Sequence, residues 1–142
     1  MKQIFINIPV SDIEKSMQFY LALGFTLNPL FTDKEQKSLV WSDSIHLMLQ
    51  SRHFSNSYLE KQMIDARKYQ MPSFTLPLES IGLVNEIMEN GIKAGGIEPV
   101  ASISEDFMFL RSIEDIDGYI WGLMYLDQEI FKSKKNFNPS IS

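Results

Sequence analysis

The pattern of apolar and polar positions predicts one strand–helix unit that occurs twice along the chain. An extended apolar run over residues 4–10, IFINIPV, leads into SDIEKSMQFYLALGF, where apolar residues recur at helical spacing. A second run over residues 73–78, SFTLPL, leads into ESIGLVNEIMENGI. Each helix is expected to end at a glycine, Gly24 in the first unit and Gly91 in the second. Their separation is nearly half of the 142 residues, so the repeat organises the whole chain.

Local signals place the ends of these helices and the strands that follow them. Ser11 and Glu14 in S-D-I-E predict a capping box, with the first helix beginning at Asp12, and Ser80 is the expected cap of the second helix. Turn residues divide the rest of each unit into three short strands. These are expected over residues 25–31, 36–42 and 44–50, and over 97–103, 107–113 and 118–126.

The predicted fold class is α+β, with two βαβββ modules in tandem that form one domain over residues 1–127. Its expected parts are module one (3–52), a link (53–71), module two (72–127) and then a polar C-terminal tail (128–142). The link is longer than a simple connection, residues 58–67 are a candidate helix, and loops of this length often carry function.

Strand parity separates the residues of the outer strands into two faces. One face is almost entirely large and apolar, as packing under helices requires: Ile4, Ile6, Ile8, Val10, Ile45, Leu47, Leu49, Phe74, Leu76, Leu78, Trp121, Leu123 and Tyr125. The other is mixed: Phe5, Asn7, Pro9, His46, Met48, Gln50, Ser73, Thr75, Pro77, Ile120, Gly122 and Met124. A mixed face of this kind favours a concave small-molecule pocket, with a half-exposed sheet face or a dimer contact as the alternative.

Composition narrows the classes of protein that fit. With 44% hydrophobic and 22% charged residues the chain is typical of one soluble domain, and no run approaches the roughly 20 apolar residues of a membrane span. The start reads as a strand and not a signal peptide, so a cytoplasmic protein is expected. The absence of cysteine excludes disulfides and thiolate chemistry. A net charge of −5 disfavours nucleic acid and anionic membranes as partners.

Two stretches, FINIPVSDIEKSMQFYLALGF and FMFLRSIEDIDGYIWGLMYLD, resemble the opening and closing segments of the vicinal oxygen chelate superfamily. That superfamily includes glyoxalase I, extradiol dioxygenases, and fosfomycin and bleomycin resistance proteins. The resemblance covers residues 3–127 and implies paired βαβββ modules whose mixed, curved sheets form a cup. It also implies a homodimer that shares its cups across a two-fold interface, and in the enzymes a divalent metal in the cup.

The resemblance places the four metal-ligand positions of the enzymes at Phe5, Met48, Ser73 and Gly122. Phenylalanine, methionine and glycine side chains offer none of the imidazole or carboxylate donors that such ions prefer, and serine is a poor substitute. We therefore expect no metal, no cofactor and no catalytic residue of the usual type. A metal-dependent lyase, isomerase or dioxygenase that uses non-standard ligands, such as His46 with Gln50, remains the alternative.

Other polar residues have both a structural and a functional interpretation. His46 could act as an acid, a base or a hydrogen-bonding group, although a lone strand histidine is more often structural. Asn7 and Thr75 occupy equivalent places in the two modules and could face each other across one cup. Arg111 could hold an anionic substrate, but a surface ion pair with Glu114 or Asp115 is the favoured interpretation.

The sequence D-I-D-G, from Asp115 to Gly118, contains two nearby carboxylates but is interpreted as hairpin chemistry and not as an acid–base pair. The leading hypothesis is a homodimeric protein that binds a small, partly apolar molecule without metal. Its expected pocket is lined by Phe5, Asn7, His46, Met48, Ser73, Thr75, Gly122 and Met124. A protein-interaction module with no small-molecule site is a further alternative.

Overall fold

A computed structural model of the chain describes residues 1–135. Module one contains β1 (Ile4–Val10), α1 (Ile13–Leu23), β2 (Thr26–Asn28), a 3-10 turn (Pro29–Phe31), β3 (Gln36–Ser42) and β4 (Ile45–Ser51), and α2 (Arg52–Tyr58) follows it. Module two contains β5 (Phe74–Leu78), α3 (Ile81–Lys93), β6 (Ile103–Ser104), β7 (Met108–Glu114) and β8 (Ile120–Leu126), followed by α4 (Gln128–Lys135). The predicted α+β fold with two βαβββ modules is confirmed.

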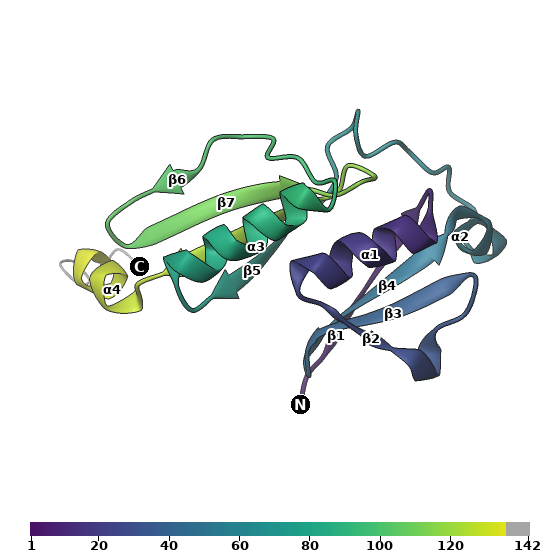
Figure 1. The fold of residues 1–142 in the computed structure, drawn as a ribbon, viewed down its shortest axis with the longest axis horizontal. Coiled ribbons are helices and arrows are strands. Elements are labelled where there is room, and N and C mark those ends of the chain that lie inside the picture. Colours follow the sequence, from purple (N-terminus) through teal and green to yellow (C-terminus); the bar gives the residue numbers. More distant parts are fainter. Residues whose placement is uncertain (136–142) are drawn as a thin grey trace.

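Each module forms its own four-stranded mixed sheet. The strand orders are β1-β4-β3-β2 and β5-β8-β7-β6, and in each sheet the first and last strands of the module pair in parallel. The modules lie side by side, with α1 and α3 adjacent between them (Figure 1). The two sheets do not join, so the described residues of one chain do not form a closed cup.

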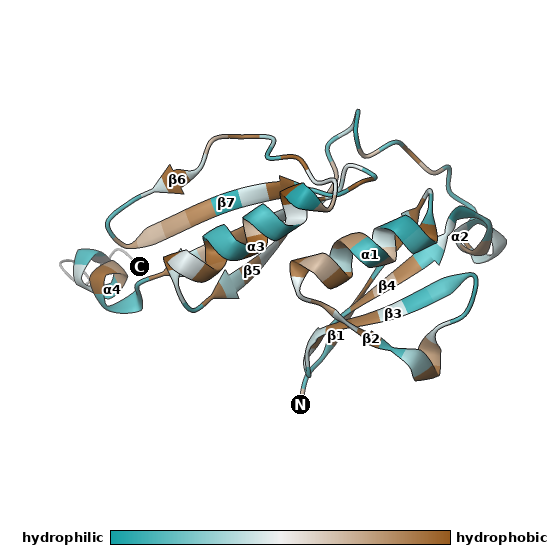
Figure 2. Ribbon diagram, in the orientation of Figure 1, coloured by the Kyte–Doolittle hydropathy of each residue, from teal (hydrophilic) through white to brown (hydrophobic). Residues whose placement is uncertain are grey.

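One hydrophobic core spans both modules. Tyr20 and Leu23 of α1 lie in the same buried cluster as Trp121 and Leu123 of β8, and the ring centroids of Tyr20 and Trp121 are 5.7 Å apart. Polar and apolar segments alternate along both helices, as expected for helices with one buried face (Figure 2). The predicted apolar strand face is buried or partly buried except at Ile4, which is 55% exposed at the start of the edge strand.

The first helix is capped one residue later than predicted. The side chain of Asp12 accepts the amide of Lys15 at 3.1 Å and is the N-cap. The amide of Ser11 donates instead to the carboxylate of Asp117, at 2.9 Å, so a contact distant in sequence replaces the capping box. The other end is as predicted, because Gly24 has φ +123° and ends the helix.

The second helix begins as predicted but does not end at Gly91. Ser80 accepts the amide of Leu83 at 3.0 Å, and the helix continues to Lys93. A Cβ atom on Gly91 would lie 2.3 Å from Cδ1 of Ile113, so this glycine is required for packing. The glycine with positive φ after the helix is Gly95, at +106°.

The link and tail also differ from expectation. The helix after module one covers residues 52–58, because Ser51 caps it by accepting the amide of Phe54 at 3.0 Å, and the candidate helix over 58–67 is wrong. The predicted strand over 97–103 is reduced to Ile103–Ser104 and one bridge between Ile97 and Glu114. The polar tail forms α4, and residues 136–142 lie outside the described residues. Among residues 1–135, none of the helices has the length and hydropathy that crossing a membrane requires.

Candidate functional site

Module one brings four of the predicted pocket residues together on one sheet face. In the register of β1 with β4, Phe5 pairs with His46 and Asn7 pairs with Met48. The rings of Phe5 and His46 are stacked with centroids 4.5 Å apart. Nε2 of His46 lies 3.1 Å from the carbonyl oxygen of Asp43, so this ring is already engaged within its own module.

Module two places the remaining residues on its separate sheet. Thr75 pairs with Gly122 and Pro77 with Met124 in the register of β5 with β8, while Ser73 directly precedes β5. A Cβ atom on buried Gly122 would lie 2.8 Å from Oγ1 of Thr75, so the threonine side chain occupies the space above the glycine. The structure thus divides the predicted pocket into two groups, one on each sheet.

A cavity of about 320 Å³ lies between the first strands of the two modules and is covered by α2 and the link. Its apolar wall includes Ile8 of β1, Leu59, Met63, Ile64 and Met71 of the link, and Phe74 of β5. Asn7, Asn56, Lys61 and Gln62 are polar residues of its lining. Asn7 is the one residue of the predicted pocket that lines this cavity.

Sequence reasoning missed most of this cavity because the link has no periodic pattern that assigns its residues to a face. The length of the link was the available signal, together with apolar residues in a segment that is otherwise polar. The tyrosine that lines the far side, Tyr119, donates its hydroxyl to the carbonyl of Pro9 at 3.0 Å and so connects module two to β1.

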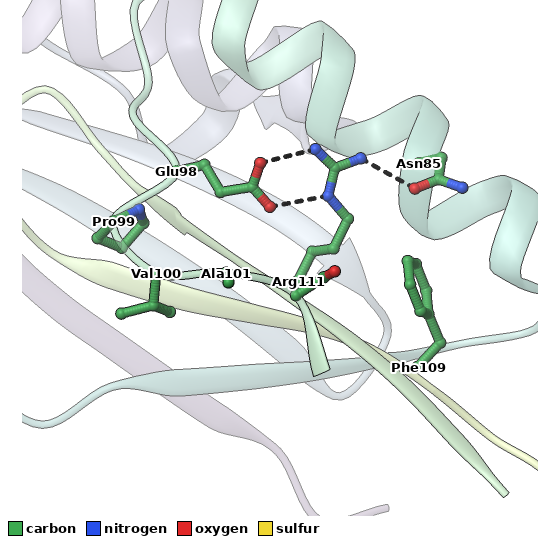
Figure 3. Close-up of a pocket in the computed structure, with 8 residues that line it drawn as sticks. Asn85, Glu98, Pro99, Val100, Ala101, Phe109 and Arg111 are labelled. Atoms are coloured by element: carbon green, nitrogen blue, oxygen red, sulfur yellow. Dashed lines mark hydrogen bonds and ion pairs between the residues drawn. The ribbon is translucent and has the colours of Figure 1, made fainter. Parts of the chain in front are cut away.

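A second, more open pocket of about 520 Å³ lies beside Arg111 of β7 (Figure 3). The guanidinium donates to both carboxylate oxygens of Glu98, at 2.8 and 2.9 Å, and to Oδ1 of Asn85 at 2.9 Å. The hydrogen bonds from Arg111 lower the pKa of Glu98, and those with Glu98 raise the pKa of Arg111. The expected ion pair exists, but its predicted partners, Glu114 and Asp115, are wrong. Since Glu98 neutralises the guanidinium, this pocket is a poor anion site.

The D-I-D-G segment is the predicted turn. Gly118 has φ +100° and donates its amide to the carbonyl of Asp115 at 3.2 Å. One oxygen of the Asp115 carboxylate accepts the amides of Asp117 and Tyr119 at 2.9 and 2.8 Å, and the other accepts the hydroxyl of Tyr20. Burial raises the pKa of Asp115 to about 6 from an ordinary value of 3.8, although these hydrogen bonds act in the opposite direction.

The same hairpin ties module two to module one. Asp117 accepts the amide of Ser11 and, at 3.3 Å, the hydroxyl of Ser16, both from the region where α1 begins. The indole of Trp121 donates to the hydroxyl of Tyr20 at 2.9 Å. Burial also raises the pKa of Tyr20, and that of Tyr119 to about 12. These carboxylates hold the modules together and do not open into either pocket.

The four positions that the sequence resemblance assigns to metal ligands do not offer a set of metal donors. Within residues 1–135 no three His, Asp or Glu side chains are grouped as a metal site would need. The alternative ligand Gln50 is buried and accepts the hydroxyls of Ser55 and Tyr58, at 3.0 and 2.7 Å, so its oxygen is already used. The pairing of His46 with Gln50 in a metal site finds no geometric support.

Comparisons with known proteins agree with the fold. Residues 2–36 match a family described as bleomycin resistance protein-like, N-terminal. A hypothetical protein, SA1046 from S. aureus, has a TM-score of 0.71 at 23% identity, over 88% of this chain and 94% of its own. A glyoxalase-related enzyme from Fulvimarina pelagi has a TM-score of 0.74 at 19% identity, over 88% of each chain. A glyoxalase/bleomycin resistance protein/dioxygenase family enzyme from Burkholderia phytofirmans has a TM-score of 0.71 at 13% identity, over 89% of this chain and 99% of its own. A search of functionally curated proteins gives no match.

Proposed function

We propose that the chain, which has the fold of glyoxalase/bleomycin resistance proteins, belongs to the vicinal oxygen chelate superfamily, and that it binds a small, partly apolar molecule without needing a metal. The observation that carries the proposal is the cavity between β1, α2, the link and β5. Its volume of about 320 Å³ falls in the range of small-molecule sites, and its walls are mainly apolar with a few polar groups.

This site lies at the edge of the predicted cup and not at its centre. Of the eight residues expected to form the pocket, Asn7 lines the cavity, and Phe74 lines it in place of its neighbour Ser73. The link supplies much of the remaining wall, which gives the long segment between the modules a role in binding. The bound molecule would contact both modules and the link at once.

The donor chemistry of the chain argues against the metal-dependent rival. Phe5, Met48 and Gly122 have no oxygen or imidazole donor for a hard divalent ion. The measurement that separates the two proposals is elemental analysis of protein purified without chelator and then incubated with manganese, iron, nickel and zinc. Near-stoichiometric metal after desalting would favour an enzyme.

We also propose that the protein forms a homodimer. Two features support this. Within residues 1–135, β1 and β5 each have a hydrogen-bonded neighbour strand on one side only, and Phe5 on the mixed face is 53% exposed. A second copy could cover both. Light scattering coupled to gel filtration tests this directly, and a monomer at all concentrations up to about 100 μM would contradict it.

Binding itself can be tested by following the side-chain amide signals of Asn7 and Asn56 in nitrogen-15 NMR spectra during titration with a set of small, neutral apolar molecules. Binding in the cavity should shift both signals. Shifts confined to residues of the Arg111 pocket, or no saturable shift with any compound, would contradict the proposal. If no small molecule binds to the protein, a protein-interaction module is the better interpretation.

A further inference from the structure

The chemical class of the ligand follows from the lining of the cavity, if the proposed binding function holds. Its polar side chains come from three segments: Asn56 from α2, Lys61 and Gln62 from the first part of the link, and Asn7 from β1. None of these four side chains makes a hydrogen bond or ion pair with another described residue. The folded chain therefore leaves three amide side chains and one ammonium group available to a ligand.

Among the described residues that line the cavity, Lys61 is the one that carries a charge. Two acidic residues of the link, Glu60 and Asp65, do not line it, and the carboxylate of Asp65 accepts the amide of Arg67 at 2.9 Å. The net charge of −5 repels anions at long range, but salt screens this over about 8 Å at physiological ionic strength. The charge that the described lining presents to a bound molecule is thus positive.

Most of the remaining lining is apolar and adaptable. It includes Met63 and Met71 together with Leu59 and Ile64, and methionine side chains adjust to flexible aliphatic groups better than branched side chains do. Apart from Lys61, the described residues of the lining carry no charge, which disfavours a second charged group on the ligand.

We propose that the cavity binds a small aliphatic monocarboxylate, with the carboxylate near Lys61 and the amides of Asn56 and Gln62, and the alkyl chain against the link and Phe74. The amide N–H groups donate to the carboxylate oxygens, and the ammonium compensates their charge. The rest of the molecule replaces water in the apolar part of the cavity.

The test is calorimetric titration of the whole chain with octanoate, octan-1-ol and octylammonium, each below its critical micelle concentration. Hexanoate and decanoate complete the set. Each added methylene should tighten carboxylate binding about threefold to fourfold while the cavity has room. The variant Lys61→Gln should weaken octanoate twofold to fivefold and leave octan-1-ol unchanged, because Lys61 is exposed and a solvated charge contributes modestly.

Leu59→Ser is a second test of the cavity, and Lys68→Gln and Leu30→Ser are controls that make the same changes outside it. Lys68→Gln removes the same charge from the same link outside the cavity and should not change octanoate binding. Leu59→Ser should weaken all three eight-carbon probes, whereas Leu30→Ser, the same change at a residue that is 85% exposed and distant from the cavity, should weaken none. Leu59 is itself 51% exposed, so its replacement leaves the core intact.

The outcomes separate the ligand class from the function. If octan-1-ol binds and responds to Leu59→Ser while octanoate does not bind, the cavity is a binding site and the carboxylate assignment is wrong. An equal effect of Lys61→Gln on all probes, or of Lys68→Gln on octanoate, would also overturn the assignment. If none of the probes binds, both the assignment and the proposed function fail.

Discussion

Replacing Asp115 with asparagine should remove a pH dependence from the stability of the protein. In the fold, burial raises the pKa of Asp115 to about 6, whereas in the unfolded chain it has its ordinary value of 3.8. Each unit of difference between the folded and unfolded pKa is worth about 1.4 kcal/mol. The ionised carboxylate of Asp115 therefore lowers the free energy of unfolding by roughly 3 kcal/mol.

The sign follows from where the proton binds. Above about pH 6 the carboxylate is ionised in both states, and the folded state bears the full cost of burying it. As the pH falls from about 7 towards 4, the folded protein takes up a proton that the unfolded chain does not, so the free energy of unfolding rises. Between pH 7.5 and 4.5 this one group should add about 2 kcal/mol, and below the unfolded pKa no more is gained.

The assay is urea unfolding followed by tryptophan fluorescence at several pH values between 4.5 and 7.5. Asparagine can still accept the amides of Asp117 and Tyr119, so the hairpin should keep its shape in Asp115→Asn. The difference in unfolding free energy between wild type and variant should then change by about 2 kcal/mol over this range. Asp43→Asn, in an exposed turn, is the control. If the difference in unfolding free energy between wild type and Asp115→Asn stays constant within about 0.5 kcal/mol over this pH range, the raised pKa of Asp115 is refuted.

Three further predictions concern packing, the hairpin and metal. Gly91→Ala should destabilise the protein by about 1–3 kcal/mol in urea unfolding, because its Cβ atom would lie 2.3 Å from Cδ1 of Ile113. Gly82→Ala, in the same helix, has room for its Cβ atom and should stabilise the protein by up to about 1 kcal/mol. Equal effects of the two changes would contradict the packing role of Gly91. Gly118→Ala should destabilise the protein more than Gly95→Ala. Both glycines have positive φ, but only at Gly118 would the new Cβ atom clash with the link, 2.5 Å from the amide nitrogen of Arg67. Similar melting temperatures of the two variants would contradict this. Treatment with a chelator should leave the melting temperature unchanged, and a fall of several degrees would indicate a bound structural metal.

Much of the fold could be predicted because it depends on local signals. The burial of Leu47, Leu49 and Leu123 follows from alternation along their strands, and the end of α1 follows from Gly24. One error, at the start of α1, arose where a distant residue takes over a local role. Asp117 binds the amide of Ser11 and displaces the capping box, and this contact is not visible in either local sequence.

The candidate site was harder to predict for the same reason. Parity places Asn7 on the correct face, but the remaining wall comes from a link without helical or strand periodicity. Its position depends on tertiary contacts: the guanidinium of Arg67 donates to the carbonyl of Ile116 at 2.9 and 3.2 Å. No property of the link sequence alone specifies that partner.

These contacts give the D-I-D-G hairpin a role in the site although it lines little of the cavity. The carboxylate of Asp117 holds the start of α1, the backbone carbonyl of Ile116 holds the link, and the neighbouring Tyr119 holds β1 through the carbonyl of Pro9. The link and β1, which both line the cavity, are therefore held by one turn, and the same turn holds the start of α1. The link backbone packs closely on the Cα atom of Gly118, because a Cβ atom there would lie 2.5 Å from the amide nitrogen of Arg67. Changes that loosen this turn should weaken ligand binding as well as stability, because they act on both modules and on the cavity wall together.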